Sequence, residues 1–360
     1  MNGKRTKTVL PGFSVFLSVL LAWAFMTPGM AGASGDFQVS DTPISNGLIV
    51  FSAYYESLYT TYVMNADGMS LRRLLETENS FGAVWSPDGR QLAFIMDEGN
   101  SHNVYVMDAD GSNQRRLTDG PSISLSLAWS PDSQHIAFVS YRDRNPLFNY
   151  DIYVVDVDTA ELHRLTQEPV LEQYPAWSPD GKSIVFTQQG VHYGNDIYIM
   201  NADGSDLHLL VEDAWGYGPV WSHDGQRIAF YNTLGSNAGI YVMDADGTNV
   251  HHLVTNLAVD PVWSPDDQTL AYVSNDGIWT MNADGTNQHR LTDRSTFDYA
   301  PEWSPDGSQI AFVSLDHEDD SDNVYVMDAD GSNRRRLSYG INSEGGLMGH
   351  VSWQPVMSRP

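Results

Sequence analysis

Cysteine is missing from the 360-residue chain. The stability of the protein therefore cannot rest on disulfide bonds, and thiolate metal sites are excluded. The G-x-S-x-G, H-E-x-x-H, Walker and G-x-G-x-x-G motifs are missing as well. Nucleophilic hydrolysis and nucleotide chemistry thus have no support from sequence motifs.

Positive charge is scarce. The chain has 19 Lys and Arg against 46 Asp and Glu, a formal net charge of −27. A surface this acidic repels phosphate backbones and anionic lipid. We therefore expect no nucleic-acid partner, whereas cations and basic protein surfaces are compatible with the charge.

Long apolar runs are limited to one, from Phe13 to Met26. It follows three basic residues in the first seven positions and precedes a small-x-small site, Ala31 to Ala33. This order is typical of an export signal, so we predict that residues 1–33 direct the protein to the periplasm or the extracellular space. The alternative is a retained membrane anchor, but an anchor needs about 20 apolar residues. The mature protein should be soluble, without membrane insertion.

Three sequence markers recur along the rest of the chain. A tryptophan, mostly within W-S-P-D-G, recurs at spacings of 44, 48, 44, 42, 40 and 50 residues, at Trp85, Trp129, Trp177, Trp221, Trp263, Trp303 and Trp353. An apolar strand such as "IAFV" and a turn such as "DADG" recur between the tryptophans. Four short strands in each unit of about 40–50 residues are the signature of a propeller blade. We predict an all-β, seven-bladed β-propeller; six blades is the alternative.

The order of the markers predicts how the ring closes. The first unit opens directly on its second strand, "GLIVFSA", and the chain ends on an unpaired first strand, "GHVSWQP". The C-terminal strand should therefore complete the first blade, which removes exposed sheet edges. The expected organisation is a signal at residues 1–33, a short segment at 34–46, the propeller at 47–356 and a tail at 357–360.

The recurring acidic turns and tryptophans have structural explanations. In S-P-D-G and D-A-D-G, Pro or Asp starts a tight turn and glycine accepts the left-handed conformation that ends it. An EF-hand calcium loop places its glycine two residues later and adds a distant Glu, so we predict turns and no cofactor, although calcium remains an alternative. The tryptophans should pack neighbouring sheets together, and the basic outer strands should block edge pairing.

The stretch "PAWSPDGKSIVFTQQ…NDIYIMNADG" resembles the WD40-like propeller repeat of the TolB family. The resemblance covers residues 47–355 and implies an exported scaffold that binds other proteins at one face of its ring. The sequence differs from TolB itself in leaving no room for an α/β domain before the first strand, and in having seven blades where six are expected.

Function should lie on the ring face opposite the two tight turns of each blade, because the variable connections are there. We call this the variable-loop face. Its aromatic residues suit protein hot spots or sugar stacking, and the strongest candidates are Trp215, Tyr217, Tyr174, Tyr193, Tyr141 and Tyr299. We predict a monomeric, non-catalytic scaffold that binds a protein or glycan.

A metal-dependent polysaccharide lyase or hydrolase is the alternative. Some seven-bladed propellers, such as the oligogalacturonate lyase family, hold a metal with several histidines at the ring face. The histidines in or beside the variable connections of this chain are His102, His192, His317 and His350. They would form a site only if they converged, which sequence spacing cannot show.

Overall fold

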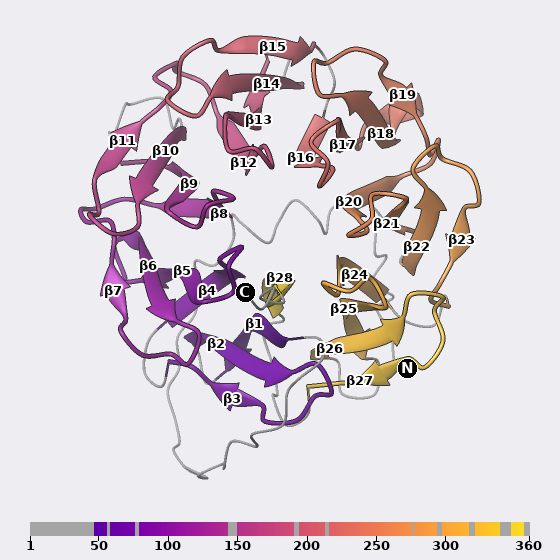
Figure 1. The fold of residues 1–360 in the computed structure, drawn as a ribbon, viewed down its shortest axis with the longest axis horizontal. Coiled ribbons are helices and arrows are strands. Elements are labelled where there is room, and N and C mark those ends of the chain that lie inside the picture. Colours follow the sequence, from indigo (N-terminus) through magenta and orange to yellow (C-terminus); the bar gives the residue numbers. More distant parts are fainter. Residues whose placement is uncertain are drawn as a thin grey trace, which may run out of the picture. The chain divides into compact units, whose positions relative to one another are not determined.

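The computed structural model describes residues 47–55, 58–75, 79–142, 150–190, 194–212, 216–275, 277–293, 297–316, 321–338 and 347–355. These residues form seven four-stranded sheets around a ring (Figure 1). The predicted all-β, seven-bladed propeller is thus confirmed. The proposed signal, the segment at 34–46 and the tail lie outside the described residues.

In blades 2 to 7 the strands follow sequence order from the ring centre to its rim, whereas in blade 1 the last strand of the chain is the innermost one (Figure 1). The innermost strands of blades 1 to 7 are β28 (Leu347–Trp353), β4 (Asn79–Trp85), β8 (Ser124–Trp129), β12 (Glu172–Trp177), β16 (Gly216–Trp221), β20 (Ala258–Trp263) and β24 (Phe297–Trp303). The second strands are β1 (Leu48–Tyr55), β5 (Gln91–Asp97), β9 (His135–Ser140), β13 (Ser183–Gln189), β17 (Arg227–Asn232), β21 (Thr269–Ser274) and β25 (Gln309–Asp316).

The third strands are β2 (Leu58–Asn65), β6 (His102–Asp108), β10 (Asp151–Asp156), β14 (Asn195–Asn201), β18 (Gly239–Asp244), β22 (Gly277–Asn282) and β26 (Ser321–Asp328). The short outermost strands are β3 (Arg72–Arg73), β7 (Arg115–Arg116), β11 (Leu162–Arg164), β15 (His208–Val211), β19 (His251–His252), β23 (His289–Arg290) and β27 (Arg335–Arg336). A 3-10 helix, η1 (Gly235–Asn237), follows β17. No helix within the described ranges is long and apolar enough to cross a membrane.

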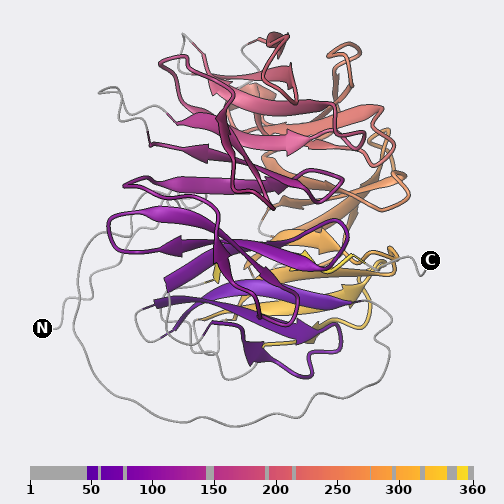
Figure 2. The same ribbon diagram turned by 60° about the vertical axis from the view of Figure 1, so that its left-hand side comes forward.

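The ring closes as the marker order predicts. Strand β28 pairs antiparallel with β1, so the last strand of the chain completes the first blade. The Gln354 backbone N–H donates to the Leu48 carbonyl at 2.7 Å beside this pairing. Figures 1 and 2 both show the yellow C-terminal strand beside the indigo first blade.

The blade core is built on one aromatic pair per sheet. The second strand of every blade buries one aromatic ring almost completely, at Phe51, Phe94, Phe138, Phe186, Phe230, Tyr272 and Phe312. Each ring stacks on an aromatic residue of the third strand, as Phe94 does on Tyr105 with centroids 5.7 Å apart. This contact explains why "IAF" and "YVM" recur together.

The tryptophans join neighbouring blades, as predicted. The indole N–H of Trp129 donates to the Val84 carbonyl of the preceding blade at 3.2 Å. The same bond recurs at Trp177, Trp221, Trp263, Trp303 and Trp353. Trp85 of blade 2 is different. It faces blade 1, the blade that β28 completes, and its buried indole N–H has no hydrogen-bond partner among the described residues.

The acidic motifs are turns, as predicted. In the D-A-D-G turn of blade 2, the Gly111 N–H donates to the Asp108 carbonyl at 2.9 Å, and one Asp110 oxygen accepts from the Ser112 backbone and hydroxyl. Gly111 has φ 91°, and a Cβ there would lie 3.2 Å from Leu74 of the preceding blade. Glycine therefore serves both the turn and the close approach of blades.

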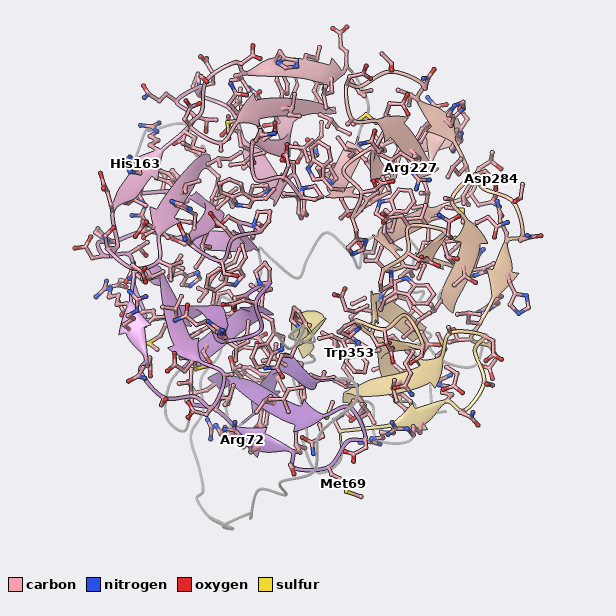
Figure 3. All side chains as sticks on the ribbon, viewed as in Figure 1. Met69, Arg72, His163, Arg227, Asp284 and Trp353 are labelled. Atoms are coloured by element: carbon pink, nitrogen blue, oxygen red, sulfur yellow. The ribbon has the colours of Figure 1, made fainter. Side chains whose placement is uncertain are left out.

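The basic outer strands also contact the neighbouring blade. Arg72 donates to the Asp110 carbonyl in the next D-A-D-G turn at 3.1 Å, and Arg335 donates to the Asp67 carbonyl at 2.8 Å. Figure 3 shows Arg72 on the rim of the ring, far from Trp353 near its centre. These contacts give two of the outer-strand arginines a structural role.

Candidate functional site

A bulge interrupts the innermost strands at one repeated position. The residue three positions before the blade tryptophan has a positive φ at Gly82, Ser126, Tyr174, Gly218, Asp260 and Ala300. The pairing register shifts at each of these places, so that two residues of the inner strand oppose one on its neighbour. The bulge is therefore a property of the blade, and its side chain varies.

Tyrosine is the least expected residue at this position. Tyr174 has φ 55°, a conformation that is an outlier for a bulky side chain. Asp260 occupies the same position two blades later with φ 53°. Backbone strain of this kind costs roughly 1–3 kcal/mol and is concentrated at functional sites. Tyr174 and Asp260 are therefore the starting points of a candidate site.

Four residues from three consecutive blades form what we call the tyrosine cluster: Tyr174, Tyr217, Tyr231 and Asp260. The rings of Tyr174 and Tyr217 meet edge to face with centroids 6.5 Å apart. Tyr217 stacks on Tyr231 at 5.8 Å. The Asp260 carboxylate is close enough to act electrostatically on Tyr174 and Tyr231.

The phenols of the tyrosine cluster are neutral at physiological pH. Burial, with smaller effects of Asp260 and Tyr217, raises the pKa of Tyr174 to about 12. Burial also raises the pKa of Tyr217, and it raises the pKa of Tyr231 well above its ordinary value. Neutral phenols beside a carboxylate can stack on a ligand and exchange hydrogen bonds with it. This chemistry suits recognition.

The structure brings together two of the predicted aromatic residues, Tyr174 and Tyr217. Tyr141 lies elsewhere, against Tyr150 at 6.0 Å. Tyr299 lies against Phe297 at 6.0 Å, and burial, the charge of Asp322 and a hydrogen bond to it raise the Tyr299 pKa. Trp215 and Tyr193 lie outside the described residues.

The predicted placement of Tyr174, Tyr217 and Tyr299 in variable connections is wrong. All three lie in innermost strands, in β12, β16 and β24. The bulge breaks the alternation of buried and exposed residues, so the strands begin earlier than their apolar pattern indicates. Sequence reasoning also missed Asp260 and Tyr231, although the fixed distance from Trp263 marks the bulge position of Asp260.

The described structure contains one of the four candidate metal histidines in full. His102 begins β6, with Nε2 3.6 Å from the Asp97 carboxylate, and burial lowers its pKa. His192 and His317 lie outside the described residues, as does the side chain of His350. Among the described residues, no group of three or more His, Asp or Glu is placed to hold a metal ion.

Comparison with known proteins identifies the repeat. The family model of the TolB beta propeller domain matches residues 61–210, 96–277 and 255–355. The Tol-Pal system protein TolB of Anaeromyxobacter dehalogenans (strain 2CP-C) is 32% identical over 115 residues, which are 30% of this chain. The match spans about a quarter (26%) of that relative's length.

Solved propellers share the fold at low sequence identity. TolB from Acinetobacter baumannii has a TM-score of 0.58 and 18% identity, over 87% of this chain and 68% of that one. An oligogalacturonate lyase in complex with manganese has a TM-score of 0.60 and 17% identity, over 81% of this chain and 84% of that one. Puromycin hydrolase has a TM-score of 0.65 and 14% identity, over 82% of this chain and 52% of that one. Because a TolB, a lyase and a hydrolase share this fold at under 25% identity, these likenesses establish the architecture alone. The repeats matched by the family model, together with the seven closed blades, show that this chain belongs to the TolB β-propeller family.

Proposed function

We propose that this protein is an exported, monomeric scaffold that binds a segment of a partner protein, without catalysis, at the tyrosine cluster, near the ends of the innermost strands that face the variable loops. The observation that carries the proposal is Tyr174, held at φ 55° beside Tyr217 on the innermost strands. Six blades share this bulge conformation, but only here among those six does an aromatic ring occupy it, and that ring meets a second one, which suits contact with a ligand.

Family membership and the N-terminal sequence support export and protein binding. The relatives named Tol-Pal system protein TolB match part of this chain. The basic, apolar and small residues at positions 1–33 follow the order of an export signal.

The tyrosines of the cluster are unsuited to act as general bases. A general base must be able to accept a proton near neutral pH. The Tyr174 phenol, with a pKa of about 12, stays protonated there. The alternative of a metal-dependent lyase or hydrolase has its own test, the metal content of the purified protein and its loss on His102→Ala or His350→Ala.

The binding proposal is tested by affinity capture. Residues 34–360 serve as bait in an envelope and secreted fraction of the producing organism, beside a Tyr174→Gly/Tyr217→Leu variant. Ser126→Gly is the matched control, because Ser126 holds the same bulge position with φ 55° and no ring. A polypeptide retained by the parent and the control, but lost from the double variant, supports the proposal. Equal retention by all three baits contradicts the proposed site, and retention of glycan alone contradicts the partner class.

A further inference from the structure

At two joints the indole of a blade tryptophan lies close to the first residue of the preceding blade's second strand. Arg227 begins β17, and its guanidinium lies 4.5 Å from the centroid of the Trp263 ring. His135 begins β9, and its ring lies 6.4 Å from that of Trp177. This position therefore determines what covers the indole of the next blade.

Between blades 6 and 7 the equivalent residue is Thr269, the first residue of β21. Its side chain is shorter than that of arginine or histidine, and Trp303 is partly exposed there. A groove of about 520 Å³ opens at this place, lined by Thr269, Trp303, Asp266, Asp306 and Gly307 among others. The groove lies over Trp303 at the position that Arg227 fills over Trp263 one blade earlier.

The neighbouring joint shows which group fits over this indole. Besides stacking on Trp263, Arg227 donates to the Asp267 carbonyl at 2.9 Å. Asp267 is four residues after Trp263, and Gly307 is four residues after Trp303, in the same turn with a positive φ. The groove over Trp303 therefore presents the same two features, an indole and a turn, that hold the Arg227 guanidinium against blade 6.

The charge of the groove is complementary to a cation. Asp266 of blade 6 and Asp306 of blade 7 both line it. Hydrogen bonds from the Ser264 hydroxyl and the Gln268 backbone lower the pKa of Asp266, so its carboxylate is ionised at neutral pH. A guanidinium over tryptophan is attracted by the negative face of the ring, and nearby carboxylates add to that attraction.

We propose that the groove between blades 6 and 7 binds an arginine side chain presented by a partner polypeptide, stacked on Trp303 as Arg227 is stacked on Trp263. The groove lies beside the S-P-D-G turn of blade 7, hence on the face opposite the variable loops. It is a second site, whose existence does not depend on the proposed function of the tyrosine cluster.

The test uses NMR of the purified protein labelled with ¹⁵N-tryptophan, titrated with acetyl-Gly-Arg-Gly-amide. Thr269→Arg should fill the groove from within, shift one indole signal and thereby assign Trp303. In the parent protein the peptide should move that same signal saturably. Two control peptides replace the arginine by citrulline, which has the same shape without the charge, or by lysine. Each should bind at least about tenfold more weakly than the arginine peptide.

Two variants separate the groove from general attraction to an acidic surface. Thr269→Arg should weaken peptide binding about tenfold or more. Gln268→Arg, which adds the same charge at an adjacent exposed residue, should leave binding within about twofold. Arg227→Thr should open a second groove and let the peptide shift a second indole signal. Equal weakening by Thr269→Arg and Gln268→Arg, or equal binding of the citrulline peptide, would overturn the proposal. Movement of the Trp303 signal by a methyl glycoside but not by the arginine peptide would overturn it as well.

Discussion

Glu172 is a buried carboxylate in the joint between blades 3 and 4. Its side chain is 0% exposed, and Oε1 has no hydrogen-bond partner among the described residues. Oε2 accepts from the Thr166 hydroxyl and from the Ile152 backbone N–H. Asp151, equally buried and paired with Arg164 at 2.9 Å, lies nearby. Burial, with a contribution from Asp151, raises the pKa of Glu172 to about 8.

The raised Glu172 pKa predicts a stability that falls with pH. The ordinary glutamate value is 4.5, so the folded protein holds this proton where the unfolded chain has released it. The contribution is complete below about 4.5 and is lost as the pH rises through about 8. Glu172→Gln should therefore gain stability relative to the parent from pH 5 to pH 8, by at most about 5 kcal/mol. Urea unfolding at several pH values measures this difference, and a difference independent of pH would contradict the burial of an ionisable group at this joint.

Tyr174 gives a second prediction at the residue scale. Glycine adopts φ 55° without strain, so Tyr174→Gly relieves backbone strain while it removes the contacts of the ring. We expect its free energy of unfolding to stay within about 1 kcal/mol of the parent value. Ser126→Gly, at the equivalent bulge, isolates the backbone effect. A loss of several kcal/mol in Tyr174→Gly alone would make the ring a core residue and remove the argument for a ligand.

At the scale of the structural element, the inter-blade indole bonds differ at one joint. Trp129 donates to the Val84 carbonyl at 3.2 Å, whereas the Trp85 N–H has no partner in the described part of the chain. Both side chains are buried, at 9% and 5% exposure. Replacement by phenylalanine therefore removes similar packing at the two positions, but a hydrogen bond only at Trp129.

Trp129→Phe should consequently destabilise the protein by about 1–2 kcal/mol more than Trp85→Phe does. Chemical denaturation of the two variants provides the comparison. The outcome that contradicts this interpretation is an equal or larger loss at Trp85, which would mean that its indole N–H is satisfied in solution.

The sequence markers predict these elements well because each one corresponds to a repeated contact. The tryptophan marks an inter-blade bond, the "IAF" strand marks a buried ring, and the D-A-D-G glycine marks the approach of the next blade. The candidate site is harder to predict, because it depends on side chains that differ between blades. Tyr174 and Tyr217 were found from their aromaticity alone. Asp260 and Tyr231 join them only through the curvature of the ring, which no local pattern encodes.

At the scale of the whole molecule, stability depends on the strand that closes the ring. Strand β28 supplies the innermost strand of blade 1 and carries Trp353, whose indole N–H donates to the Glu302 carbonyl of blade 7 at 3.3 Å. A chain that ends at residue 346 lacks these contacts and leaves β1 as an exposed edge. It should unfold at a markedly lower temperature, with a broadened transition, whereas a chain that ends at Pro355 should match the parent. Calorimetry distinguishes the two, and a truncated chain as stable as the parent would contradict closure by β28.

The central claim is that a partner polypeptide contacts the tyrosine cluster on the innermost strands. Site-specific photo-crosslinking in the producing organism tests it most directly, with benzoylphenylalanine in place of Tyr217. The control places the same group at Tyr105, on the third strand of blade 2, where the ring stacks on Phe94. We predict one discrete protein adduct at position 217, lost when Tyr174→Gly is added, and none at position 105. No adduct at position 217, or the same adducts at both positions, would contradict the account.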